Sequence, residues 1–183
     1  MGIPLNLIHF LIGAPILAYI FIHGLFFTKD KTNVVTKYFA VACGIYAIAA
    51  LGYVLPSLFT SDSGVLTITT IVADFFQFLS LAVVSLLATH LSLSRWPLLH
   101  RLANISIFLL TCVYTYVSIR ENFGYPAHLE IRNGSTYLDY VATRTYSIWT
   151  GIAFSSLLFV GISFLTQVKE VMKASQRYRI AAF

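Results

Sequence analysis

The apolar stretch from residue 65 to residue 92 constrains the fold of this chain more than any other feature. It is 28 residues long and holds a single acidic residue, Asp74, well inside it. About 20 apolar residues in a helix are enough to cross the hydrocarbon layer of a bilayer, so the stretch predicts a transmembrane helix. A carboxyl group at that depth is costly in lipid and should face protein or trapped water. Asp74 is therefore the first candidate functional residue, and the alternative is a buried acid that only holds helices together.

The composition of the chain agrees with a membrane protein. Of its 183 residues, 58% are hydrophobic and 10% are charged, whereas about a quarter of the residues in soluble domains are charged. No polar stretch is long enough for a second domain, so residues 1–183 are predicted to form a single all-α domain, a multi-pass integral membrane bundle with the lipid bilayer as its main partner. The net charge of +5 lies in short loops and a tail, which membrane topology explains without a nucleic-acid partner.

Hydropathy predicts five transmembrane helices and a short tail. The spans are expected at about residues 4–27, 38–59, 65–92, 102–119 and 141–168, followed by a tail at 169–183. Nine of the twelve Lys and Arg residues fall on one side of these spans. Because basic residues are enriched in cytoplasmic loops, this distribution predicts an N-terminus outside and a cytoplasmic C-terminus. In the second span, Ala40 and Gly44 stand at a spacing that lets helices pack closely.

Polar residues gather on narrow stripes of the third and fifth spans. On a helix that advances about 100° per residue, Asp74 shares its stripe with Thr70 and Gln77, whereas Arg144 shares its stripe with Tyr140 and Ser147. Both charged residues enter from the outer side, so Asp74 and Arg144 are expected to pair. The predicted ligand-binding residues are accordingly Thr70, Asp74, Gln77, Tyr140, Arg144 and Ser147. A dry core of hydrogen-bonded hydroxyls is the alternative.

Histidines define a second candidate site. His9 and His23 are 14 residues apart in the first span, a spacing that puts both on nearly one helix face, roughly 21 Å apart along the axis. Bundles that hold two b haems use such pairs. His90, near the inner end of the third span, is a candidate partner for His23. Haem b is thus the cofactor that these three histidines would hold, while no other metal site is indicated.

Three functions fit this pattern. The preferred one is a non-catalytic membrane protein, namely a subunit, a scaffold or a binder of a small hydrophobic ligand, with a polar interior around Asp74 and Arg144. The partner would then be another membrane protein or a hydrophobic small molecule. The alternatives are a b-type cytochrome that moves electrons across the bilayer and a membrane enzyme that uses Asp74 as acid or base on a lipid-like substrate. The sequence leaves open whether the chain is an enzyme. Asn133, in the longest outer loop, begins an Asn-Gly-Ser sequon for glycosylation.

Overall fold

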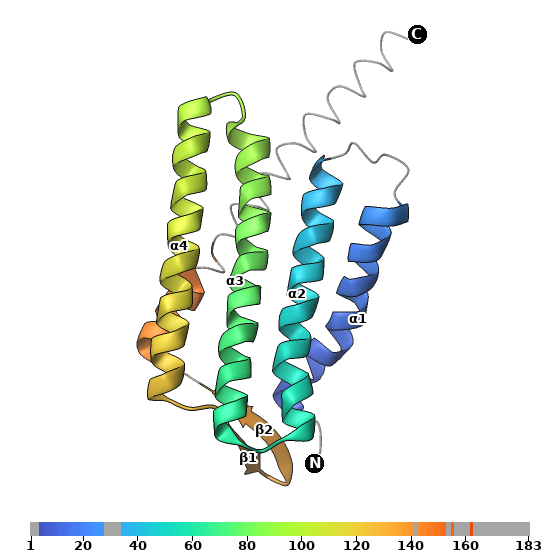
Figure 1. Cartoon of the computed structure of the whole chain (residues 1–183), viewed down its shortest axis with the longest axis vertical. Helices are drawn as coiled ribbons and strands as arrows, with labels where there is room; N and C mark the ends of the chain where they lie inside the picture. The colour runs from blue at the N-terminus through green and yellow to red at the C-terminus, as the bar shows by residue number, and fades with distance from the viewer. Residues whose placement is uncertain (1–3, 28–33, 141–142, 153–154, 156–161, 163–183) are drawn as a thin grey trace.

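The structure, a computed structural model, describes residues 4–27, 34–140, 143–152, 155 and 162. Long antiparallel helices dominate it (Figure 1). The helical elements are η1 (Leu5–Leu7, a 3₁₀ turn), α1 (Ile8–Ile22), η2 (His23–Phe27, a π-helical turn), α2 (Val34–Phe59), α3 (Ser63–Leu93) and α4 (Pro97–Gly124).

Four helical stretches are long and apolar enough to cross a membrane. They are Leu5–Phe27, Val34–Phe59, Ser63–Leu93 and Pro97–Gly124, and they coincide with the first four predicted spans. The chain therefore has the build of a membrane protein. α4 begins and ends about one turn beyond the predicted 102–119, an extension that matters below.

Neighbouring helices follow one another in a row from α1 to α4 (Figure 1). Short connections force this antiparallel order. The Asp62 side chain caps the N-terminus of α3 by accepting a hydrogen bond from the Val65 backbone N–H, at 2.9 Å. A turn of three residues after α3 leads to Pro97, which opens α4 at a position where a missing N–H costs nothing.

Small residues hold α2 close to its neighbours. Ala40, Cys43, Gly44, Ala47 and Ala50 are all buried, as their spacing predicts. A Cβ atom added to Gly44 would lie 2.6 Å from Cδ2 of Phe21 in α1. A Cβ at Gly52 would lie 3.2 Å from the Cβ of Ala73 in α3. The small side chains thus permit close helix packing inside the bundle.

The structure is mostly helical, as predicted, and a single β-hairpin among the described residues interrupts the polar segment after α4. Strand β1 (His128–Arg132) pairs antiparallel with β2 (Ser135–Asp139), with Arg132 opposite Ser135. The two residues between them, Asn133 and Gly134, have φ angles of 52° and 78°. Two left-handed residues make the turn that best matches the twist of a hairpin, and Asn-Gly is the sequence that favours it. Asn133, the predicted glycosylation site, lies exposed at this turn.

The hairpin closes one end of the bundle, which we call the hairpin end (Figure 1). Leu138 is buried in the main core cluster, together with Leu7, Tyr53 and Leu66. The Asn6 side chain donates to the Leu138 carbonyl at 2.9 Å and accepts from the Leu138 N–H at 3.2 Å. These contacts fix β2 against the start of the chain, so the hairpin is part of the packed structure.

The predicted fifth span is described only in its first part. Residues 144–152 are helical and pack against α4, where the Trp149 ring lies 5.9 Å from the Tyr114 ring. The Thr143 hydroxyl donates to Glu121 Oε2 at 2.5 Å. The rest of the predicted 141–168 span, apart from residues 155 and 162, and the predicted tail at 169–183 lie outside the described residues.

Candidate functional site

Asp74 lies at the centre of a buried polar network. Asp74 has 0% of its surface exposed. It stands eleven positions after the first residue of α3, about 16 Å along the helix axis. The Tyr53 hydroxyl of α2 donates to Asp74 Oδ1. From α4, the Ser118 hydroxyl donates to Asp74 Oδ2 at 2.5 Å and the Asn122 amide donates to the same atom at 3.2 Å. Three helices therefore converge on one carboxylate, which satisfies a group that would be costly to leave unpaired.

Helix 144–152 places Tyr146 beside this network, with its hydroxyl near the Asp74 carboxylate. Tyr53 has a second acceptor, Gln77 Oε1, at 2.9 Å. The Asn122 amide nitrogen is further bonded to the Ser118 carbonyl at 2.9 Å, while Asn122 Oδ1 is without a hydrogen bond from the described residues. Hydrogen bonds thus link Asp74 to α2 and α4, and Tyr146 brings helix 144–152 next to it.

The prediction that Asp74 and Arg144 form an ion pair is wrong. Arg144 is exposed, and the ion pairs among the described residues do not join it to Asp74. The physical reason is helical rotation: Tyr146 stands two residues after Arg144, or about 200° around the helix. Because Tyr146 faces Asp74, Arg144 points away from it. Hydroxyl and amide donors replace the expected cation.

The stripe on α3 is buried as predicted. Thr70 and Asp74 are fully buried and Gln77 is half-buried. Three members of the network were missed by sequence reasoning, namely Tyr53, Asn122 and Tyr146. In the sequence, Asn104, Thr111, Thr115 and Ser118 fall on one face of the fourth span. Asn122 stands four residues after Ser118 and continues this face, so the signal was present beyond the predicted end of the span. Tyr53 carried a weaker signal: a tyrosine in an apolar span needs a partner for its hydroxyl.

A pocket opens beside this network at the hairpin end. It has a volume of about 460 Å³, within the range of small-molecule sites. The residues that line it include Asn6, Leu138, Asp139, Tyr140, Tyr146 and Ser147. Tyr146 connects the pocket directly to Asp74, and the Tyr140 ring lies 6.2 Å from the Tyr53 ring. The predicted residues Tyr140 and Ser147 thus lie in the pocket, while Thr70 and Asp74 lie in the core.

The histidines predicted for haem lie apart from this site. His9 and His23 are exposed on the first span, where the His9 ring lies 4.1 Å from Phe10 and the His23 ring 5.7 Å from Tyr19. His90, also exposed, lies near the other end of α3, with its ring 6.1 Å from that of His100. The structure therefore places these three imidazoles outside the Asp74 network.

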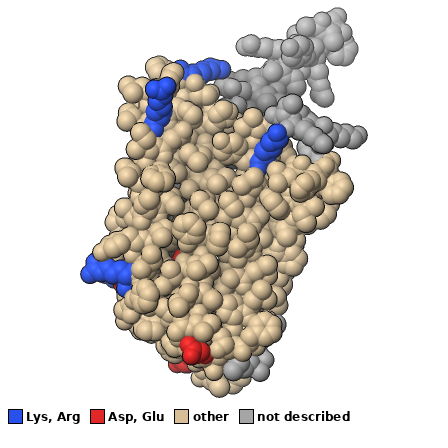
Figure 2. Space-filling view, in the orientation of Figure 1, with Lys and Arg blue, Asp and Glu red and all other residues tan. Residues whose placement is uncertain are grey.

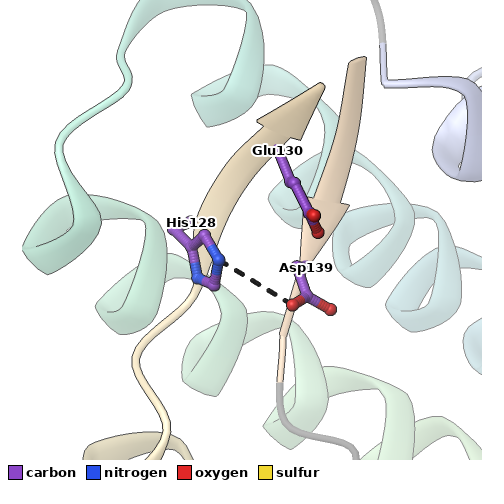
Figure 3. A group of neighbouring side chains, drawn as sticks. All are labelled: His128, Glu130 and Asp139. Atoms are coloured by element: carbon purple, nitrogen blue, oxygen red, sulfur yellow. Dashed lines mark ion pairs between the residues drawn. The ribbon is translucent and has the colours of Figure 1, made fainter. Parts of the chain in front are cut away.

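A second polar cluster lies on the hairpin (Figure 3). His128 and Asp139 are directly opposite across the strands, and one possible ligand atom from each of His128, Glu130 and Asp139 lies within 4.8 Å of the others. Arg132 already binds the carboxylates: its Nη2 lies 2.5 Å from Glu130 Oε2 and 3.9 Å from Asp139 Oδ2. The hydrogen bond from Arg132 holds the pKa of Glu130 below its ordinary value. The cluster is a salt-bridge network that a metal ion would have to displace.

Two further cavities lie along the apolar body of α3 and α4. One has a volume of about 250 Å³ and is lined by residues such as Phe78, Leu81 and Tyr114. The other has a volume of about 550 Å³ and is lined by residues such as Phe75, Leu79 and Phe108. Both have mostly apolar walls, as expected for surfaces in contact with lipid chains.

No protein-family model, curated protein or solved structure matches the chain.

Proposed function

We propose that the chain is a non-catalytic integral membrane protein that binds a small amphipathic ligand in the hairpin-end pocket. One observation carries the proposal: Tyr146 lines the pocket and also lies beside the carboxylate of Asp74, which is fully buried in α3. Buried polar groups in membrane spans are expensive and commonly mark binding sites. The pocket combines aromatic and aliphatic surface with several polar groups, and convergent polar groups fix the orientation of a ligand in a small-molecule site.

The proposed topology has five spans with the hairpin end outside and the C-terminus in the cytoplasm. Figure 2 supports the orientation, since basic side chains lie at the end remote from the hairpin and acidic ones near the hairpin, although a basic group also lies on the hairpin half. The nine Lys and Arg residues assigned inside flank the inner ends of the five predicted spans in the sequence. The positive-inside rule is counted over such short flanking segments. The ligand would accordingly enter from the outer side.

The burial of Asp74 also bears on the alternative of an enzyme. A general acid or base must come within hydrogen-bonding reach of its substrate. Asp74 has no exposed surface, and its carboxylate is occupied by donors from α2 and α4. This arrangement favours a carboxylate that positions Tyr53 and Tyr146 at the site over one that reacts with a lipid-like substrate.

The proposal predicts that the purified protein retains a small molecule in this pocket. Native mass spectrometry of the full chain should show an adduct, and Ser147→Trp should remove most of it because the larger side chain fills the pocket. Ile148→Trp is the matched control, since Ile148 is the next residue along the helix and is exposed. The proposal is wrong if no adduct is found, or if Ser147→Trp and Ile148→Trp retain it equally.

A further inference from the structure

We infer that the hairpin-end pocket selects organic cations, in which an ammonium group is attached to an apolar body. The inference rests on the proposed function and specifies the ligand of the same site. It follows from the charges, the aromatic rings and one free carboxylate oxygen at the pocket.

The charges that lie nearest the ligand are negative. Asp139 is the charged residue among the described residues that line the pocket. Asp74 lies behind Tyr146 and outside the described lining. Arg144 stands one turn before Ser147, but its side chain is exposed and it is not part of the described lining. An anionic head group would therefore meet the Asp139 carboxylate, whereas a cation would be attracted by it.

One oxygen of the Asp139 carboxylate, Oδ1, is available to a ligand. Its contacts with Tyr125, His128 and Arg132 all go to Oδ2, at 3.0, 3.8 and 3.9 Å. Arg132 is engaged more closely by Glu130, at 2.5 Å, than by Asp139, with which it forms a longer ion pair. Oδ1 takes no part in these contacts and can accept a hydrogen bond from, or lie against, a ligand ammonium.

Tyrosine rings supply the second element of cation recognition. Tyr140 and Tyr146 both line the pocket, and Tyr53 stands behind Tyr140 with its ring 6.2 Å away. The faces of aromatic rings attract ammonium groups, and binding sites for quaternary ammonium ions are commonly built from such rings. A neutral ligand of the same shape would gain neither this attraction nor the contact with Asp139.

The test uses two probes of the same shape and the full chain in a neutral maltoside detergent. Benzyltrimethylammonium carries the charge, and neopentylbenzene is its neutral carbon isostere. We expect the cation to bind at least about tenfold more tightly by ligand-observed NMR, since a desolvated cation–π contact together with a carboxylate is enough for that factor. Competition with hexadecylphosphocholine distinguishes the two possible sources of the bound cation. If it displaces benzyltrimethylammonium, the ligand is assigned as a lipid head group; if it does not, the ligand is assigned as a free organic cation.

Single substitutions test which residues cause the preference for the cation over its neutral isostere. Asp139→Asn and Tyr140→Leu should each weaken binding of the cation by about fivefold to tenfold and leave binding of the isostere unchanged. Asp62→Asn is the matched control, because it removes one acidic charge at the same end of the bundle and keeps a residue that caps α3. It should change neither affinity by more than about twofold.

The outcomes separate this inference from the proposed function. If both probes bind equally and Ser147→Trp removes both, the pocket binds ligands but does not select cations, and only the inference is overturned. Only the inference is likewise overturned if neither probe binds but the native adduct is still lost in Ser147→Trp. If neither probe binds and the adduct is insensitive to Ser147→Trp, both the inference and the proposed function are wrong.

Discussion

Asp74→Leu is expected to lower the free energy of unfolding by about 2–4 kcal/mol, which would be among the largest single losses in the bundle. The substitution removes the acceptor for the Ser118 hydroxyl. Tyr53 retains Gln77 as a partner, and the Asn122 amide retains the Ser118 carbonyl, so the loss should stay below the sum of three separate hydrogen bonds. Unfolding in mixed micelles titrated with dodecyl sulfate measures this difference.

A double-mutant cycle identifies the partners of Asp74. Tyr53→Phe should couple to Asp74→Leu by about 0.5–1.5 kcal/mol, because the two side chains are hydrogen-bonded. Arg144→Gln should cost about 0.5 kcal/mol or less, and its effect should add to that of Asp74→Leu, since Arg144 is exposed. A coupling above about 1 kcal/mol between Asp74 and Arg144 would restore the ion pair and contradict the network described above.

Gly44→Ala is expected to destabilise the bundle by about 1–3 kcal/mol. The added Cβ would lie 2.6 Å from Cδ2 and 2.7 Å from Cγ of Phe21. Rotation of the ring about the Cβ–Cγ bond leaves Cγ in place, so relief of the clash requires a different χ1 rotamer of Phe21 or movement of α1 away from α2. The same unfolding assay measures the loss.

Gly13→Ala is the matched control for this prediction. No atom lies within 4 Å of the position that its Cβ would occupy. Alanine is the better helix former by about 1 kcal/mol in water, so this variant should be neutral or slightly more stable. Equal effects of the two substitutions would mean that α1 and α2 do not pack through Gly44.

The first four helices could be predicted because long apolar stretches have few alternatives. Residues 65–92 are too long and too apolar for a soluble helix, and the structure has α3 at Ser63–Leu93. The buried face of α3 was equally predictable. A polar residue that faced lipid would be costly, so the stripe through Thr70 and Asp74 had to turn inward.

The partners of Asp74 could not be predicted from stripes alone. A stripe gives the angle of a residue on its own helix, but not the rotation of that helix against its neighbours. Arg144 and Tyr146 both stood near the right depth, and only packing decided which of them faced Asp74. Placing the end of the fourth span at residue 119 also excluded Asn122, because hydropathy falls before the helix ends.

The hairpin has a sequence signal that coincides with the predicted glycosylation sequon. Asn133-Gly134-Ser135 is a sequon, and Asn-Gly between two strand-like segments also favours a two-residue hairpin turn. Leu138 in the second of these segments is the residue that the hairpin buries against the bundle. Strong helical patterns elsewhere in the chain made a single short sheet easy to overlook.

Cysteine labelling tests the central claim of a bundle with five spans and its hairpin end outside most directly. Glu130→Cys, Ser94→Cys and Ser175→Cys would each be placed in a chain without Cys43 and Cys112, expressed in intact cells and treated with a membrane-impermeant maleimide. Residue 130 should react at once, whereas residues 94 and 175 should react only after the membrane is permeabilised. Reaction of residue 175 from outside, with residue 94 protected, would leave an even number of spans and contradict the proposed topology.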